Sequence, residues 1–185
     1  INEHLIVNGE INYDQHLHNG VNTQYTFQPE PADTVEINDG DFDDNYDVEG
    51  YFDINQTFDN PDREFNFSLN YDYQKDNESE SLKSDTTTLF QYVNGININL
   101  SYKHPLNEKS KVELGYDGKI NDNTEIMNFQ ITDASNIFEG ENTFGYKRSI
   151  HGFFLEYDYK LSEKFSIKPS IRYEFVSKDI SFKSI

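Results

Sequence analysis

Cysteine is absent from this chain of 185 residues, which excludes disulfide bonds and thiolate metal sites. Basic residues are scarce: 15 Lys and Arg stand against 34 Asp and Glu, for a formal net charge of -19 at pH 7. Nucleic acid is therefore not an expected partner, because phosphate groups are bound mainly by Lys and Arg. No run of about 18 apolar residues occurs, so a transmembrane helix is excluded as well.

Catalytic and targeting motifs are missing too. The chain has no Gly-x-Ser-x-Gly, no glycine-rich phosphate loop and no His-Glu-x-x-His, and neighbouring carboxylates mean little in so acidic a sequence. We therefore expect no enzyme activity and no required cofactor. The chain begins at Ile1 and has no basic and apolar leader, so we expect a processed product or a fragment.

Aromatic residues, in contrast, are abundant. The mean hydropathy of -0.83 resembles that of a soluble or disordered chain. However, aromatic residues make up 15% of the sequence, with 13 Tyr and 15 Phe. Disordered chains are poor in these residues, whereas half-buried strands are rich in them. The composition therefore favours a β-protein.

Apolar and polar residues alternate strictly through the segment 150–176. Side chains on a strand point to opposite faces with a period of two, so this pattern predicts two strands joined by a short polar turn at 161–164. The apolar parity shifts between Tyr146 and Phe153, which predicts a β-bulge. We expect a single all-β domain over residues 1–185, an antiparallel up-and-down meander of about eight strands. The alternation places other strands at 5–14, 46–57, 65–74, 96–102 and 112–120, and it extends the first strand of the pair to 143–160.

A sheet with one apolar face has two common explanations. Its apolar face can cover a protein core, or it can meet lipid while the polar face lines the wet interior of a barrel. The expected connections alternate in length: 59–63, 104–109 and 161–164 are short, whereas 15–45, 75–88 and 121–141 read as long outer loops. Within them, 21–27 could form a short strand or part of a small hairpin, and 127–131 could extend a strand. In a meander this places all short turns at one end, as in outer-membrane barrels, so the pattern favours a transmembrane β-barrel.

The membrane interpretation assigns each face a role. We expect the polar face to line the lumen, where its charges either pair and hold the wall or select solutes by charge. The predicted lipid-facing residues are Phe65, Phe67, Leu69, Leu100, Leu114, Ile171 and Tyr173. The predicted lumen-facing residues are Glu113, Lys119, Glu156, Asp158, Lys168, Arg172 and Glu174.

Two stretches carry a family pattern. In NGININLSYKHPLNEKSKVELGYDGKINDN, a strand ends in Tyr-x-x-Pro-Leu at Tyr102 to Leu106, and the next strand contains Leu114 directly followed by Gly115 and Tyr116. In FGYKRSIHGFFLEYDYKLSEKFSIKPSIRYEF, the second signature is Ser-Ile-Arg-Tyr-Glu from Ser170 to Glu174. These residues resemble the outer-membrane β-barrel family of Bacteroidetes, the barrel portions of TonB-dependent receptor-like proteins. The resemblance covers roughly 46–180.

The resemblance implies a place in the bacterial outer membrane and a role in energy-coupled nutrient uptake. The implied partners are outer-membrane lipid, an unknown nutrient ligand met at the long loops, and an energy-coupling protein contacted through parts not in this chain. Family receptors have a plug domain and far more strands, so the chain is either a segment of a larger barrel or a small barrel. Pro169 departs from the family pattern and predicts an edge or a bulge, because Pro cannot donate to a ladder.

Two other functions remain open at this point. The chain could be a soluble, secreted β-sandwich that binds glycan or protein through its acidic loops. It could also be a small outer-membrane barrel with a purely structural role.

Metal-binding patterns are weak. Asp39, Asp41 and Asp43 have the spacing that opens a calcium loop, but the sixth and twelfth positions are Asp44 and Gly50, where the motif needs Gly and an acid. A looser calcium site and a solvated acidic loop both remain open. His16 and His18 would share one face of a strand and offer two imidazoles, without an evident third ligand.

Overall fold

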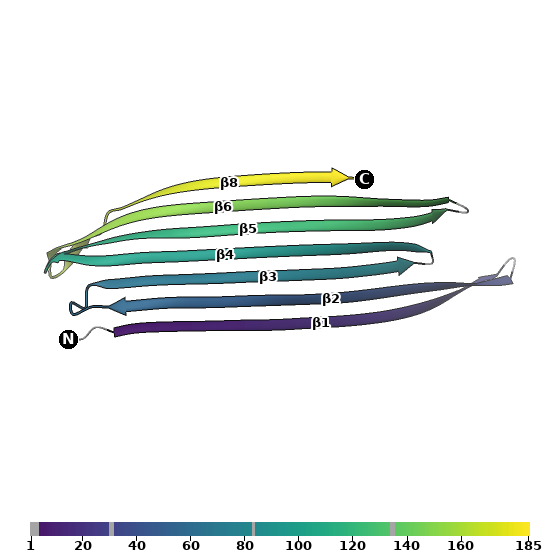
Figure 1. Cartoon of the computed structure of the whole chain (residues 1–185), viewed down its shortest axis with the longest axis horizontal. Helices are drawn as coiled ribbons and strands as arrows, with labels where there is room; N and C mark the ends of the chain where they lie inside the picture. Colours follow the sequence, from purple (N-terminus) through teal and green to yellow (C-terminus); the bar gives the residue numbers. More distant parts are fainter. Residues whose placement is uncertain (1–3, 30–31, 83, 134–135) are drawn as a thin grey trace.

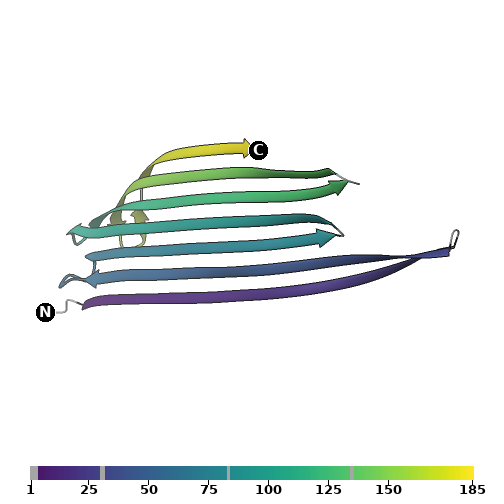
Figure 2. The same cartoon turned by 45° about the vertical axis from the view of Figure 1, so that its right-hand side comes forward.

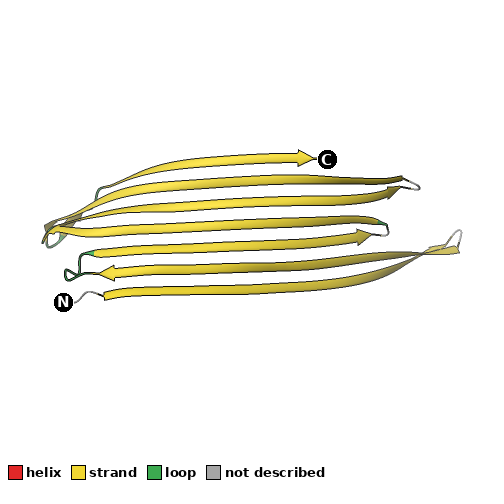
Figure 3. Ribbon diagram, viewed as in Figure 1, coloured by secondary structure: helices red, strands yellow, loops and turns green. Residues whose placement is uncertain are grey.

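The computed structural model describes residues 4–29, 32–82, 84–133 and 136–185, with the backbone alone for 22, 24–29 and 32–38. The described residues form one antiparallel β-sheet (Figures 1 and 3). No helix among them is long or apolar enough to cross a membrane. The strands are β1 (His4–Pro29), β2 (Ala32–Thr57), β3 (Glu64–Leu82), β4 (Asp85–Asn107), β5 (Ser110–Asp133), β6 (Asn136–Ser162), β7 (Phe165–Ile167) and β8 (Ser170–Ser184).

The strands follow one another in space as they do in sequence. The sheet order is β1-β2-β3-β4-β5-β6-β7, and β8 also pairs with β6. β7 and β8 therefore occupy one strand position, interrupted at Lys168 and Pro169. Pro169 thus lies at the edge of the sheet, in the break between β7 and β8, as expected for a residue without an N–H. Its carbonyl still accepts a 3.0 Å hydrogen bond from the Tyr157 amide. The predicted all-β meander of about eight strands is confirmed.

The three short turns lie at one end of the sheet (Figure 1). Polar side chains close each of them by accepting a hydrogen bond from a backbone amide two residues on, as Asn and Ser do in turns. Asn60 Oδ1 accepts from the Asp62 amide at 3.0 Å, Asn107 Oδ1 from the Lys109 amide at 2.9 Å, and Ser162 Oγ from the Lys164 amide at 3.3 Å. These side chains explain why the chain reverses at the predicted positions.

The predicted long loops are wrong. The segments 15–45, 75–88 and 121–141 belong almost entirely to the strands, and the ladder of β1 and β2 continues from Gln15↔Tyr46 to Pro29↔Ala32. Apolar alternation fades in these segments, so the sequence pattern indicated strand only in short stretches, at 21–27 and 127–131. Backbone hydrogen bonds do not need an apolar face, and pairing continues once neighbouring strands are in register. The β1–β2 hairpin extends furthest beyond the other strands (Figures 1 and 2).

The predicted bulge between Tyr146 and Phe153 is also wrong. β6 pairs with β5 in an unbroken register from Ser110↔Tyr159 to Asp133↔Asn136. The parity shift in the sequence therefore means that apolar side chains change from one face of the sheet to the other, without an inserted residue.

The sheet is a single layer. No hydrophobic side chain among the described residues is buried, and Leu114 and Ile171 are 45% and 68% exposed. A sandwich would bury these residues between two packed sheets about 10 Å apart. The fold therefore contradicts the sandwich alternative and leaves the apolar face in need of an apolar surrounding.

Candidate functional site: the two faces of the sheet

All seven residues predicted to face lipid lie on one face of the sheet. The strand register aligns them in rows that cross every strand. One row joins Val7, Ile54, Phe67, Leu100, Tyr116, Phe153 and Tyr173, and the next joins Leu5, Gln56, Phe65, Tyr102, Leu114, Leu155 and Ile171.

The apolar rows form a band of limited height, which we call the apolar band and define on β3 as Phe65 to Tyr73. From the first to the ninth of these residues there are eight steps of about 3.3 Å, roughly 26 Å along the strand, and nine residues are about what a tilted transmembrane strand needs. Outer-membrane barrels carry an apolar band about 25 Å tall. Leu69 lies at its centre, between Phe52 on β2 and Ile98 on β4.

Tyrosines mark both borders of the apolar band. On the side away from the short turns, Tyr46 lies between Tyr13 and Tyr73, with ring centroids 6.3 and 5.8 Å apart. On the turn side, Tyr102 stacks on His104 at 5.9 Å, and Tyr157 stacks on Tyr159 at 6.2 Å. Aromatic rings at two heights are typical of membrane interfaces, where one end of the ring is apolar and the other meets water.

The residues predicted to face the lumen lie together on the opposite face. Glu113 and Glu156 are direct cross-strand neighbours, and Lys168 pairs with Glu156. Arg172 reaches Asp117 at 2.5 Å and Glu174 at 3.5 Å. Lys119, Asp158 and Glu174 occupy positions of the same parity on this face. We call it the polar face.

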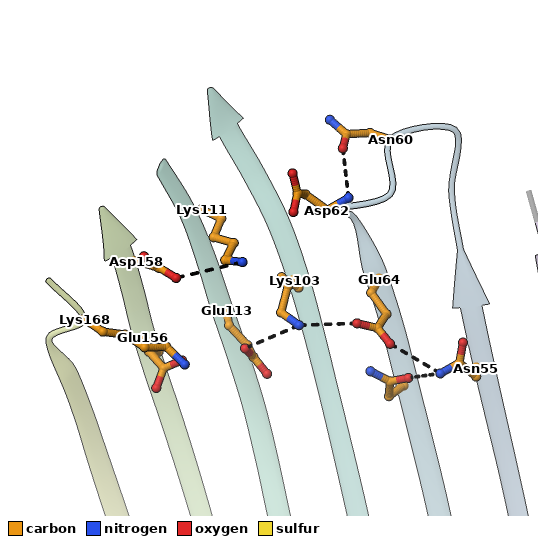
Figure 4. A network of polar contacts seen from close by, with 11 residues as sticks. Asn55, Asn60, Asp62, Glu64, Lys103, Lys111, Glu113, Glu156, Asp158 and Lys168 are labelled. Carbon is orange, nitrogen blue, oxygen red and sulfur yellow. Dashed lines mark hydrogen bonds and ion pairs between the residues drawn. The ribbon is translucent and has the colours of Figure 1, made fainter. Parts of the chain in front are cut away.

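A polar network crosses the polar face near the short turns (Figure 4). Lys103 lies between two carboxylates, with its Nζ 3.3 Å from Glu64 and 4.0 Å from Glu113. Asn55 extends the network by donating to Glu64 at 3.4 Å and to Asn66 at 2.5 Å. Sequence reasoning missed Glu64, Lys103 and Asn55, although each has the parity of the polar face.

The network continues to the edge strand. Lys111 lies 3.9 Å from Asp158, and Lys168 pairs with Glu156 (Figure 4). The hydrogen bond to Glu156 raises the pKa of Lys168, which lies between β7 and β8 outside the apolar band. One group of contacts thus joins β2 to β5 through Lys103, and two separate ion pairs join β5 to β6 and β6 to the segment between β7 and β8, an arrangement that fits a wall held by its own ion pairs.

The predicted metal ligands lie far from this network, on the outer half of β1 and β2. Asp39, Asp41 and Asp43 share one face of β2, and His18 Nε2 lies 3.0 Å from Asp41. The segment is extended strand, so it does not curl its carboxylates around one point. Among the described side chains, no three His, Asp or Glu residues are placed to hold a metal ion. Calcium binding stays a prediction from sequence.

The sequence matches a known family over most of its length. A family model described as "Outer membrane protein beta-barrel family" matches residues 52–184, more than half of the chain. The chain belongs to the outer membrane protein β-barrel family. Membership places the protein in the outer membrane and excludes the soluble secreted alternative. A search of curated proteins finds no match.

Solved structures show the same kind of wall. The crystal structure of the ferric yersiniabactin uptake receptor FyuA from Yersinia pestis aligns with 97% of this chain at 10% identity and a TM-score of 0.52. The alignment covers 38% of that receptor, so this barrel segment spans well under half of its length. The CymD monoaromatic hydrocarbon channel aligns at 8% identity over 98% of this chain and 85% of that one, with a TM-score of 0.16 that supports no argument about fold.

Proposed function

We propose that the chain forms part of the barrel wall of a TonB-dependent outer-membrane receptor that takes up a nutrient. Family membership and the likeness in fold to an uptake receptor support this proposal. The observation that carries it is the apolar band, which crosses the whole sheet at membrane height with tyrosines at both borders and polar residues behind it.

In this function the apolar face meets lipid and the polar face lines the lumen. The strands continue well beyond the band, so their outer halves rise above the membrane as an extended wall, and the ligand is met on that wall. The partners are outer-membrane lipid, the nutrient, and an energy-coupling protein contacted through parts outside this chain. The barrel provides a path and a binding surface without catalysis, and its host is a member of the Bacteroidetes.

Growth on single nutrients tests the uptake function. A strain that lacks the full-length protein is compared with a strain that lacks the energy-coupling protein, each over a panel of scarce nutrients supplied one at a time. We expect both strains to lose growth on the same nutrient, and plasmid-borne protein to restore it in the first strain. A strain that grows normally on every nutrient but leaks periplasmic proteins would instead indicate a structural barrel.

A further inference from the structure

Beyond the apolar band, on the side away from the short turns, the two faces of β6 and β8 exchange character, whereas β4 and β5 carry mixed residues on both faces. One row on the polar face joins Val93, Asn123, Tyr146 and Ile180, and the next joins Gln91, Glu125, Phe144 and Phe182. Ile180 and Phe182 are 63% and 71% exposed. The opposite face at the same height carries Tyr92, Thr124, Gly145 and Ser181.

This exchange agrees with a wall that leaves the membrane. Above the lipid the outer surface of β6 and β8 meets water and carries small or charged residues, such as Gly145 and Ser181. Their inner surface exposes aromatic and aliphatic side chains, which are stable there only when something covers them. The inner surface at this height is therefore built to receive an apolar group.

Three cations lie directly below these apolar rows on the same face. Arg148 is the cross-strand partner of Lys178, and Lys119 is the cross-strand partner of Ile150, one row nearer the short turns. Like charges directly opposite one another destabilise a sheet. In the described part of the chain, no carboxylate forms an ion pair with any of the three. The Nε of Arg148 is buried and has no hydrogen-bond partner.

Most other cations inside the described strands behave differently. Lys103, Lys111, Lys147 and Arg172 pair with a carboxylate and Lys75 lies over the Tyr46 ring, whereas Lys160 and Lys183, near strand ends, form no ion pair with the described residues. In a chain with a net charge of -19, unpaired cations on neighbouring positions are unexpected. Their charge is therefore available to a group from outside the sheet.

The rest of the polar face at this height repels anions. Among the described residues, β1, β2 and β3 carry no Lys or Arg on the polar face at this height. Their polar-face carboxylates are Glu10, Asp14, Asp39, Asp41, Asp43, Asp47, Glu49, Asp72, Asp76, Glu78 and Glu80. The potential of this acidic wall would direct an anion in the lumen toward the three cations.

We propose that Arg148, Lys178 and Lys119, together with Tyr146, Ile150 and Ile180, bind an anionic organic ligand, one with a carboxylate or phosphate beside an apolar or aromatic body. The guanidinium and the ammonium groups hold the anionic group, and the neighbouring apolar rows cover its body. Rows on one face repeat every two residues, about 6.6 Å apart, which suits a small molecule. The inference rests on the proposed function, because it needs the polar face to be the inner one.

Binding of 2-naphthoate to the full-length protein in amphipol tests the site, measured by equilibrium dialysis against amphipol alone. 2-Naphthamide serves as the neutral probe of the same shape. The double variant Arg148→Gln/Lys178→Gln removes the facing cations. The matched control, Lys160→Gln/Lys164→Gln, removes two exposed cations near a short turn.

We expect wild type to prefer 2-naphthoate over 2-naphthamide, the double variant to bind 2-naphthoate at least tenfold more weakly, and the control to match wild type. Equal binding by the double variant overturns the site. Equal binding of 2-naphthoate and 2-naphthamide by wild type also overturns the site. That result is expected if an acidic segment of the same protein already neutralises the three cations. Outer-membrane fractionation of the same preparations separates the two proposals: an inserted protein that does not bind the probe contradicts the site alone, and a protein absent from the outer membrane contradicts both.

Discussion

At the scale of single residues, the two faces of one strand differ sharply. Leu69 lies at the centre of the apolar band between Phe52 and Ile98, whereas its neighbour Asn70 lies on the polar face opposite Asn97. In the proposed function an arginine would meet hydrocarbon at the first position and water at the second. Adjacent positions on β3 therefore provide a matched pair of variants.

Leu69→Arg should reduce insertion into the outer membrane, because a cation on the lipid face at mid-height costs about 2–4 kcal/mol. Asn70→Arg, its control, should insert like wild type. The measurement is the fraction of protein in the outer membrane that migrates as a folded, heat-modifiable species. Equal insertion of both variants would contradict the assignment of the apolar face to lipid.

Gly115 shows how closely neighbouring strands approach on the polar face. A Cβ at this position would meet the ring of Phe154 and lie 2.7 Å from the Leu100 carbonyl oxygen. The ring covers the glycine, so the small residue and the large one form a matched cross-strand pair. Gly9 has more space, because its nearest neighbour, the Tyr51 carbonyl oxygen, lies 3.7 Å away.

Gly115→Ala should therefore destabilise the folded barrel by about 1–3 kcal/mol, the usual cost of overpacking. Gly9→Ala should change stability little. Urea unfolding in lipid vesicles, followed by heat-modifiable migration, measures the difference. If both variants unfold at the same urea concentration, the close contact with Phe154 and Leu100 is not rigid.

At the scale of elements, each long strand has two parts. The part near the short turns carries the apolar band, and the outer part continues the same ladder with mostly polar side chains. β1 and β2 pair without a shift from His4↔Thr57 to Pro29↔Ala32. The outer part of this hairpin can therefore be removed in register, because Leu17 and Asp44 face each other directly.

Replacing residues 18–43 with Asn-Gly should preserve insertion. The dipeptide favours the tight turn that joins two antiparallel strands, and every band residue of β1 and β2 remains. The shortened protein should reach the outer membrane in the same amount as wild type. Loss of insertion would show that the outer hairpin is needed to assemble the wall and does not simply extend it.

At the scale of the whole molecule, the parity of the strands limits how the sheet can close. β7 and β8 share one position, so β1 and β8 run in the same direction at the two edges (Figure 1). An antiparallel up-and-down barrel joins its first and last strands antiparallel, which explains the even strand numbers of single-chain bacterial barrels. The wall therefore needs further strands to close.

Introduced cysteines test this closure cleanly, because the chain has none of its own. Val7→Cys/Ile54→Cys joins direct neighbours on β1 and β2 and should form a disulfide in the folded protein. Val7→Cys/Tyr173→Cys joins the two edges and should remain reduced under the same oxidising conditions. Gel mobility before and after reduction measures both. Cross-linking of the edge pair would show that these strands close on themselves.

The sequence by itself determined the strand type, the three short turns and the division of the band into two faces. Each of these depends on local rules, namely the alternation of side chains along a strand and the hydrogen bonds of Asn and Ser in turns. Phe65, Leu69 and Leu100 could thus be grouped correctly on one face without coordinates.

Only the tertiary structure decided how far the strands run and which residues meet across them. The outer parts of the strands have a weak apolar pattern and are held as strand by pairing with neighbouring strands, as Asp39 to Asp43 are with Glu78 to Leu82. Register between strands likewise decides that Arg148 lies directly opposite Lys178 and that Lys103 forms an ion pair with Glu64. Register is a property of pairs of strands, and no single strand encodes it.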